Sequence, residues 1–440
     1  MQLGVMYHLM VNSLLAQAGD QRPAPHTHNI FRGMRTPPSI HITLDALPAT
    51  PHLKTWWCEL EAKADLTFFT SWSWIGPWLD VLPAALQKHL LVARQGERIV
   101  GLGIVVKGQA HLMRTMPVLC WRLHATGVRD IDDLSIEYNG FLVDRHCTDD
   151  VEQAMLNFLL QHTGVKRVEV AMASARFADL ARPAPKGILV RSDFKKSYLV
   201  DLNQVRASAG GFLATLSANT RGQIKRSLSA YRELGEVRVE AAQSTAQALA
   251  FFNELKTLHA QIWVERGKHS RFATSPVAHQ FHIALIANAF DQGEVQLLRI
   301  TAGNHTLGYL YNFVYRGRVI FYQSGFHYGL LGKHDRPGMV CHALAIEHQL
   351  QAGHLLYDFA AGDYRYKASL AKHHEIQGSH VFQRDGLMPR LDASMRVLLR
   401  RVRQWRAQAS VVAMSAVGGL HMAIADQADW LSICWTSAAA

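Results

Sequence analysis

The sequence lacks the features that mark several classes of protein. Its five cysteines are widely spaced and form no C-x-x-C pair, so neither a disulfide framework nor a zinc knuckle is expected. No stretch of about 18 uninterrupted apolar residues occurs, and the nearest candidate, residues 409–425, is broken by serine, glycine and histidine. The first 20 residues lack the basic start of a secretory signal. These absences favour a cytoplasmic protein.

The composition is that of a folded chain. The sequence has 440 residues, of which 49% are hydrophobic and 18% are charged, so a largely disordered or fibrous protein is excluded. The net charge is +11, and most of the excess lies in residues 201–406, with 25 basic and 15 acidic groups. Such an excess suits a phosphorylated ligand, an anionic membrane or nucleic acid, in that order of preference.

The first half of the chain is typical of a mixed α/β unit. Residues 1–40 are rich in proline and polar residues, which predicts a flexible leader. Apolar periodicity and turn residues then mark the elements. We expect helices at 53–64 and 149–164, a short helix starting at Pro77, and strands at 89–94, 98–108, 117–125, 134–144, 166–172 and 197–202.

The second half repeats this order. We expect helices at 219–234, 244–264, 276–290, 337–353 and 364–372, and strands at 295–303, 305–317, 318–326, 355–360 and 376–384. The chain is therefore divided into two similar domains, residues 41–200 and 201–386. A basic amphipathic helix at 387–406 follows, and then a tail, 407–440, of unassigned role.

The stretch before the helix at 337–353 offers a candidate anion site. It contains Gly329, Gly332 and Lys333, and the helix begins at Pro337–Gly338 after a strand. The free amides at a helix N-terminus bind phosphate groups well. An ordinary strand–helix crossover with a glycine-containing loop explains the same residues equally well.

The order of elements and several segments resemble a known family. The segments are 68–78, 138–144, 219–235, 263–272, 321–326 and 357–367. Together they resemble the GNAT-like acetyltransferases associated with bacterial cellulose and exopolysaccharide biosynthesis, which are related to the Fem-type aminoacyltransferases. The resemblance implies an α/β fold of two tandem GNAT-like (acyl-CoA N-acyltransferase) domains, each a mixed central sheet flanked by helices, with the first domain degenerate.

The resemblance also implies an acyl-CoA site in the second domain. Strands 318–326 and 355–360 would separate and hold the pantetheine arm of acyl-CoA, most simply acetyl-CoA, and no metal is needed. The residues implied in binding the donor are Gln323, Ser324, Gly325, Phe326, Lys333, Gly338, Met339 and Val340. Pro337 departs from the family's phosphate loop, because proline has no N–H to offer. An aminoacyl-tRNA donor, as in Fem-type enzymes, therefore stays open, and tRNA is the one nucleic acid considered.

The same resemblance supplies candidate catalytic and acceptor residues. Asp358 would take the proton from the attacking amine or hydroxyl, and Tyr366 would protonate the leaving thiolate. Asp363, Lys367, Trp263 and Arg266 would contact the acceptor. The acceptor would be a sugar or a cell-envelope or exopolysaccharide precursor. The alternative from another class is a scaffold in exopolysaccharide assembly that keeps the fold without activity.

Two further patterns suggest partners. The 24 histidines include His279-x-x-His282 and His373–His374, but neither pair is completed by a cysteine or an H-E-x-x-H arrangement, so no metal is expected. Residues 390–406 place apolar side chains on one side of a helix and arginines on the other. That pattern suits peripheral contact with an anionic membrane, at its inner face, or a terminal helix packed on the domain.

Overall fold

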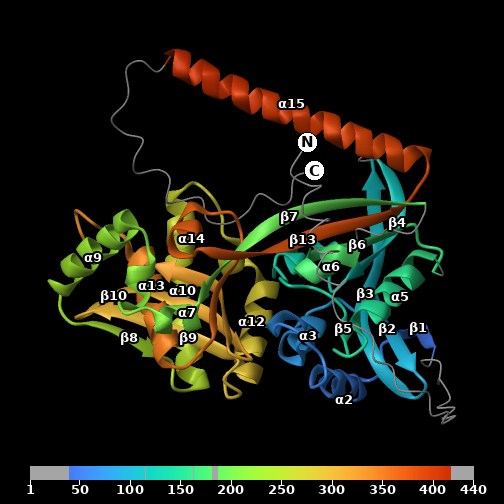
Figure 1. Ribbon diagram of the computed structural model, residues 1–440, viewed down its shortest axis with the longest axis horizontal. Coiled ribbons are helices and arrows are strands. Elements are labelled where there is room, and N and C mark those ends of the chain that lie inside the picture. Colours follow the sequence, from blue (N-terminus) through green and yellow to red (C-terminus); the bar gives the residue numbers. More distant parts are fainter. Residues whose placement is uncertain (1–38, 114, 162, 181–186, 418–440) are drawn as a thin grey trace, which may run out of the picture. The chain divides into compact units, whose positions relative to one another are not determined.

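The computed structural model describes residues 39–113, 115–161, 163–180 and 187–417 (Figure 1). The predicted leader, residues 1–40, lies outside the described residues apart from its last two. The predicted tail begins inside a helix that continues to residue 417, and its remainder, 418–440, also lies outside them.

The first half alternates helices and strands as expected. Its elements are β1 (Ile40–Ala46), α2 (Thr50–Glu61), η1 (Phe68–Thr70), α3 (Trp72–Asp80), β2 (Gln87–Gln95), β3 (Arg98–Leu112), β4 (Met116–Leu123), α4 (Arg129–Asp132), β5 (Leu142–Val143), α5 (Thr148–Gln161), β6 (Arg167–Ala173), α6 (Ala175–Leu180) and β7 (Ile188–Asp201).

The second half continues without a break. Its elements are α7 (Leu202–Ala207), α8 (Gly211–Thr215), α9 (Ala218–Arg232), β8 (Val237–Ala241), α10 (Thr245–Glu265), α11 (Arg271–Thr274), α12 (Pro276–Ala289), β9 (Val295–Ala302), β10 (His305–Tyr315), β11 (Arg318–Phe326), α13 (Pro337–Gln351), β12 (Leu356–Ala361), α14 (Arg365–Leu370), β13 (His373–Arg384) and α15 (Leu387–Val417).

Two local predictions were wrong. The strand predicted at 134–144 is reduced to Leu142–Val143, because Ser135 and Tyr138 adopt positive φ angles of 54° and 49°, which an extended strand does not allow. The short helix predicted to start at Pro77 begins instead at Trp72, so the proline lies inside it.

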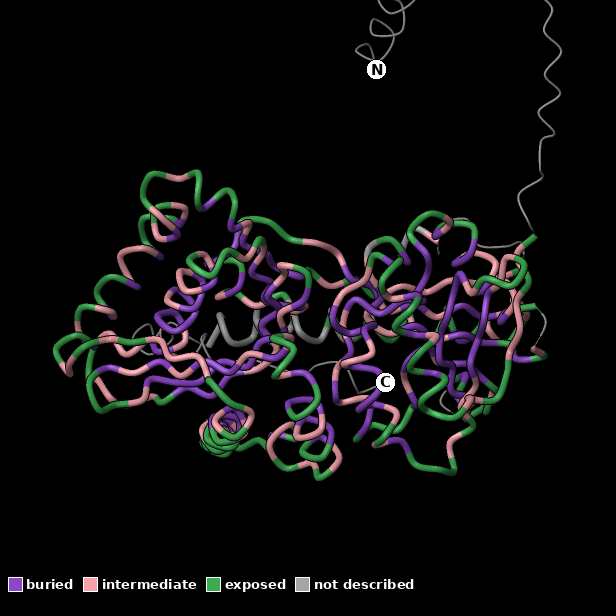
Figure 2. Tube along the Cα trace, turned by 90° about the horizontal axis from the view of Figure 1, so that it is seen from below, coloured by how far each residue is buried: buried purple, intermediate pink, exposed green. Residues whose placement is uncertain are grey.

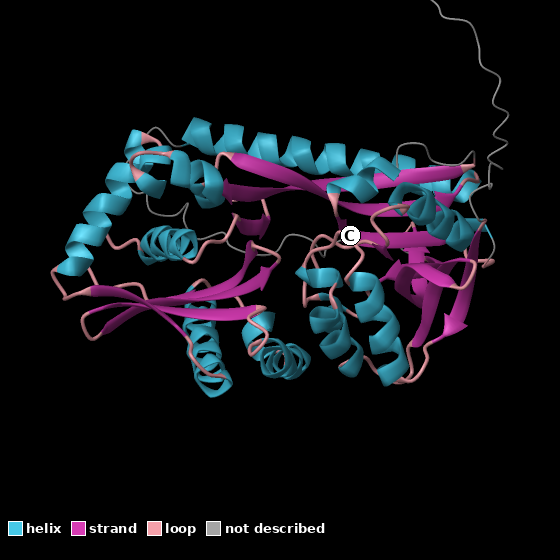
Figure 3. Cartoon of the chain, turned by 60° about the horizontal axis from the view of Figure 1, so that its bottom comes forward, coloured by secondary structure: helices cyan, strands magenta, loops and turns pink. Residues whose placement is uncertain are grey.

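The described strands pair into one 13-stranded mixed sheet, which confirms the α/β class (Figure 3). Its strand order is β1-β2-β3-β4-β6-β13-β7-β12-β11-β10-β9-β8, with β5 paired to β3. Each half contributes four antiparallel strands and one parallel neighbour. In the first half β4 runs parallel to β6, and in the second β11 runs parallel to β12.

The two halves exchange their last strands. β13, from the end of the second half, pairs with β6 of the first, and β7, from the end of the first half, pairs with β12 of the second. β7 and β13 also pair with each other, and in Figure 1 they run side by side between the two groups of strands. Residues 41–200 and 201–386 are therefore interleaved in the sheet, since the proposed boundary falls at the end of an exchanged strand.

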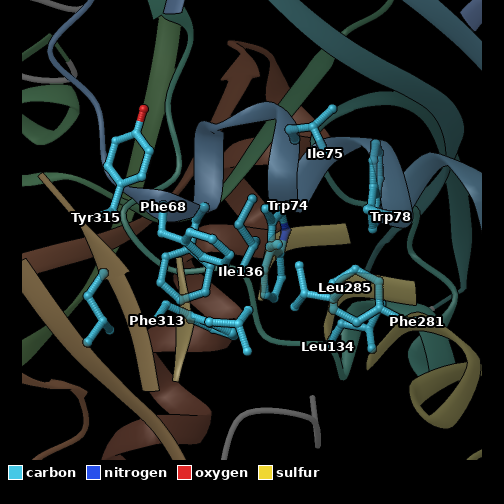
Figure 4. Packing of buried hydrophobic residues seen from close by; sticks show 14 of the residues in the cluster. Phe68, Trp74, Ile75, Trp78, Leu134, Ile136, Phe281, Leu285, Phe313 and Tyr315 are labelled. Atoms are coloured by element: carbon cyan, nitrogen blue, oxygen red, sulfur yellow. The ribbon is translucent and has the colours of Figure 1, made fainter. Parts of the chain in front are cut away.

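One aromatic core joins the halves. Phe68 of η1 stacks on Phe313 of β10 with ring centroids 4.3 Å apart, and Trp74 of α3 meets Phe281 of α12 at 4.8 Å (Figure 4). The buried residues follow the strands in both halves (Figure 2). Tyr315, beside this core, donates a hydrogen bond to Glu61 of α2. This packing fixes the first half against the sheet of the second.

Candidate active site

β11 and β12 lie together for only three residues and then diverge. Their parallel register covers Arg318–Leu356, Val319–Tyr357 and Ile320–Asp358. Beyond these pairs no described strand continues the ladder on the β12 side of β11. Tyr322 is the extra residue of a β-bulge in β11, because Tyr311 pairs with Gln323 and Asn312 with Phe321. We call this opening between β11 and β12 the wedge.

The equivalent position in the first half is filled by the chain itself. Asn139 forms a bridge to Ala173 of β6, its amide donates to the Met172 carbonyl, and its side-chain nitrogen donates to the Leu123 carbonyl of β4. His124 also lies against the Asn139 side-chain oxygen at 2.9 Å. The groups that a ligand would contact there are thus already satisfied.

A buried ion pair closes the narrow end of the wedge. The Arg318 guanidinium donates to Asp358 Oδ2 at 2.7 and 2.9 Å and to Glu375 at 2.8 Å. It also donates to Tyr138 Oη, which donates to Ser197, which in turn donates to Asp358 Oδ1. This network joins β11, β12, β13 and β7 to the first half.

The surroundings of Asp358 argue against the role predicted for it. Its side chain is fully buried, and its oxygens accept from Arg318, Ser197 and the Ala360 amide. With both oxygens engaged, no lone pair is aimed at the wedge for a substrate proton. Asp358 lies within β12, at the last residue that pairs with β11, and its carboxylate serves the ion pair.

A second carboxylate enters from the first half. Glu137 accepts from the Ala361 amide at 2.7 Å and from the Gln377 side chain at 3.0 Å. Burial raises the pKa of the Glu137 carboxyl, although the nearby Lys367 charge opposes the shift. A carboxylate with a raised pKa, partly accessible at the end of β12, is suited to accept a proton.

The backbone around Glu137 is strained. Tyr138, next to Glu137, has a φ of 49°, and Ala360, next to the Ala361 amide that Glu137 accepts from, has a φ of 57°. Positive φ in residues other than glycine costs free energy and persists only where the surroundings enforce it. Two such residues therefore meet at one contact between the halves.

The predicted acid lies among aromatic rings on the helix side of the wedge. Tyr366 of α14 stacks on His342 of α13 with centroids 5.8 Å apart and also touches Phe359 of β12. Burial lowers the pKa of His342 to about 3, so this imidazole is neutral at physiological pH. Tyr366 is thus placed beside the diverging strands, as its predicted role requires.

The predicted donor residues of β11 lie along the wide end of the wedge. The Ser324 amide donates to the side-chain oxygen of Gln323, and the Ser324 carbonyl faces His259 of α10 at 3.0 Å. Gly325 lies directly against α10, where an added Cβ would be 2.4 Å from the Leu255 carbonyl. Phe326 packs on His342.

The N-terminus of α13 offers fewer free amides than predicted. Val340 donates to the Arg336 carbonyl, and its side chain is fully buried, so its amide belongs to the helix. Gly338 and Met339 occupy the first turn, where amides have no partner within the helix. Lys333 is exposed in the loop before them. The loop itself is held by Asp335, which accepts from the Gly329 amide and from Tyr231.

The residues predicted for the acceptor separate into two places. Lys367 is buried beside Glu137 and donates to the carbonyls of Ala360 and Ala361, and Asp363 accepts from Tyr198 of β7. Trp263 lies instead on α10 against the His259 ring, and Arg266 caps the end of that helix. The structure places Lys367 beside Glu137 at the end of β12, and Trp263 near the far end of β11.

The pair His279 and His282 lies away from the wedge, whereas His374 of the pair His373–His374 packs on Tyr198, the donor to Asp363. His279 contacts Lys256, and His282 is enclosed by aromatic rings. Among the residues described, no three histidine, cysteine, aspartate or glutamate side chains are grouped as metal ligands. A surface pocket beside β8 contains none of the predicted site residues, and its arginines pair with glutamates of the same pocket.

The sequence did not single out Glu137. It precedes the segment 138–144 that carries part of the family resemblance, but its partner Ala361 is 224 residues away. The one local feature that sets Glu137 apart is that it is a glutamate in an otherwise apolar and aromatic stretch. A glutamate at the edge of a strand would give the same pattern. The exchanged strands, and not the local pattern, bring it to β12.

Comparisons with known proteins place a domain within this chain. Residues 218–368 match the family model described as an acetyltransferase (GNAT) domain. No curated protein sequence matches the chain.

Solved structures cover most of the chain at low identity. The C-terminal domain of a putative lysylphosphatidylglycerol synthetase from Agrobacterium fabrum is 10% identical, with a TM-score of 0.47, and covers 79% of this chain and 95% of that one. FemX is 8% identical, with a TM-score of 0.48, and covers 77% and 96%. A tandem GNAT protein from the clavulanic acid biosynthesis pathway is 11% identical, with a TM-score of 0.38, and covers 77% and 98%. The family match over residues 218–368 identifies an acetyltransferase domain of the GNAT type within this chain, and that domain supports an acyltransferase activity.

Proposed function

We propose that the wedge between β11 and β12 binds the pantetheine arm of acyl-CoA, and that the second half transfers the acyl group to an amine or hydroxyl. The observation that carries the proposal is the contrast between the halves. Asn139 fills the wedge of the first half, whereas β11 and β12 lose their pairing after Ile320 and Asp358. An unpaired strand edge can bind an extended ligand as a further strand would.

The chemistry requires a base, an acid and a thioester. The nucleophile's nitrogen or oxygen forms a bond to the acyl carbon as the carbon–sulfur bond breaks. Glu137, whose pKa is raised by burial, takes the proton from the nucleophile, and the Tyr366 hydroxyl gives a proton to the departing sulfur. Lys367, held at the carbonyls of Ala360 and Ala361, lowers the pKa of the Glu137 carboxyl against the effect of burial, which favours the charged form that a base needs.

The donor is proposed as acetyl-CoA, with its phosphates at Gly338, Met339 and Lys333. The acceptor is proposed, from the family resemblance, as a sugar or a precursor of the cell envelope or of an exopolysaccharide. Its reacting group would approach Glu137 from the side of the first half, near Asp363. A cytoplasmic location fits both substrates.

Calorimetric titration with acetyl-CoA and longer acyl-CoAs tests the donor. We expect one molecule bound per chain, because among the described strands only the wedge between β11 and β12 is open. Lys333→Gln should weaken binding about threefold to tenfold through the lost phosphate contact, as for a surface charge at a phosphate. Lys54→Gln, an equally exposed substitution on α2, should leave binding unchanged. Binding of charged tRNA without any binding of CoA would replace this donor with an aminoacyl-tRNA. Binding of neither would favour the alternative that the protein is a scaffold without acyltransferase activity.

A further inference from the structure

The last helix is attached to the protein by its polar side. Asp392 of α15 is buried and accepts from the Met113 amide, at the tip of the β3–β4 hairpin, at 2.7 Å. Arg396, one turn later, pairs with Asp392 and donates to the His111 carbonyl. The helix therefore uses the side that carries Asp392 and Arg396 to dock on the hairpin.

The apolar side of the same helix is left exposed. Leucine, methionine, valine and tryptophan side chains recur at helical spacing along it, and several are more than half exposed. The six side chains of this apolar side, each with its exposed fraction, are Leu387 (69%), Leu391 (45%), Met395 (43%), Leu398 (57%), Val402 (37%) and Trp405 (69%). Over these residues the stripe is about 27 Å long. A helix that merely packed on the domain would bury this side. We call these six residues the α15 stripe.

The charges beside the stripe identify the kind of partner. Residues 387–406 contain six arginines and one aspartate, and Asp392 is already paired with Arg396. Arg401 is exposed, and so is Arg390, which pairs with Asp385 just before the helix. Two copies of such a helix would repel each other, which disfavours a dimer through this face. An anionic lipid surface satisfies both the arginines and the apolar stripe, and an exposed tryptophan is favoured at the boundary of headgroups and acyl chains.

The hairpin beside α15 adds to this surface. Met113, whose amide holds Asp392, is 36% exposed, and Met116 on the other strand of the hairpin is exposed as well. Exposed apolar side chains that gather into one patch mark an interaction site, whereas scattered ones do not. We infer that α15, together with this hairpin tip, binds the surface of an anionic membrane with the α15 stripe in the lipid.

Sedimentation of the full-length protein with vesicles tests the inference. We expect binding to vesicles of equal parts phosphatidylglycerol and phosphatidylcholine, weakened by salt, and little binding to phosphatidylcholine alone. Leu398→Glu places a charge in the stripe and should weaken binding about tenfold or more. Leu355→Glu makes the same change at an exposed leucine outside α15 and should bind as the natural protein does.

Three outcomes would overturn the inference. The first is no binding to the anionic vesicles, and the second is equal binding by the Leu398→Glu and Leu355→Glu variants. The third is a dimer, seen by light scattering, that Leu398→Glu dissociates while vesicle binding is absent. A circular dichroism melt of each variant checks that α15 substitutions leave the fold intact. Because this readout does not use acyl transfer, it stands or falls independently of the proposed reaction.

Discussion

Glu137 accepts a hydrogen bond from the Ala361 amide at 2.7 Å, across 224 residues of sequence. The contact joins a loop of the first half to the end of β12, at the point where the wedge begins. It makes the second half's site depend on a residue that the second half does not contain.

Replacing this carboxylate should abolish most of the activity. We expect Glu137→Gln to lower kcat by about a hundredfold or more with little change in the affinity for the acyl donor, since the amide cannot accept the proton. Steady-state kinetics over a range of pH measures this. Because the base must be deprotonated and burial raises its pKa, the activity of the natural protein should fall on the acid side of neutrality. The residual activity of the Glu137→Gln variant should not show this fall.

The matched control for this variant is Glu347→Gln. Glu347 on α13 likewise accepts a backbone amide, that of Phe212, at 2.9 Å, but away from the wedge. Its kcat and its pH profile should be those of the natural protein. If both variants lose activity alike, the loss at Glu137 reflects structure and not proton transfer.

Asp358 and Arg318 should matter mainly for stability. Removing one partner of a buried ion pair leaves the other charge uncompensated, at about 3–5 kcal/mol. We therefore expect Arg318→Met to lower the free energy of unfolding by about this amount in urea titrations. Asp358→Asn should also destabilise the protein while the activity per folded molecule stays within a few-fold. A large loss of kcat in Asp358→Asn at unchanged stability would instead restore Asp358 as the base.

Asn139 should be required for the fold of the first half but not for chemistry. Asn139→Ala leaves the Leu123 carbonyl and the Gly140 amide without their side-chain partner in a buried place. Each such group costs about 1–3 kcal/mol, and chemical denaturation measures the sum. Asn157→Ala on α5, where the side chain accepts a hydrogen bond from Gln153, should change stability by less than about 0.5 kcal/mol. Equal effects of the two substitutions would contradict the role of Asn139 as a filler of the wedge.

The buried His342 should make stability depend on pH. Its pKa is lowered to about 3 by burial, from 6.5, so the unfolded chain binds the extra proton first as pH falls. The contribution of the neutral His342 to the free energy of unfolding is complete above pH 6.5 and is lost progressively toward pH 3, by about 1.4 kcal/mol per pH unit. His342→Phe, in a site already lined by Phe321 and Phe359, should reduce this slope by one proton. Thermal melts from pH 7 to 5 measure it.

Local sequence patterns determined most of the elements. The hairpins at β2–β3 and β10–β11, the capped helices and the separating pair β11 and β12 lie where periodicity, turn residues and family resemblance placed them. These features depend on neighbours in sequence, and a short turn can join only adjacent strands. The same reasoning failed at 134–144, because apolar alternation there conceals the left-handed Ser135 and Tyr138.

The tertiary structure alone decided the site. The sequence places Asp358 on a strand beside the proposed site, yet only the packing shows that Arg318 and Ser197 already engage its oxygens. It also brings Glu137 to Ala361 and exposes the apolar side of α15. Which side chains meet across an exchanged strand, and which face of an amphipathic helix is buried, follow from long-range pairing. The local pattern of residues contains no record of that pairing.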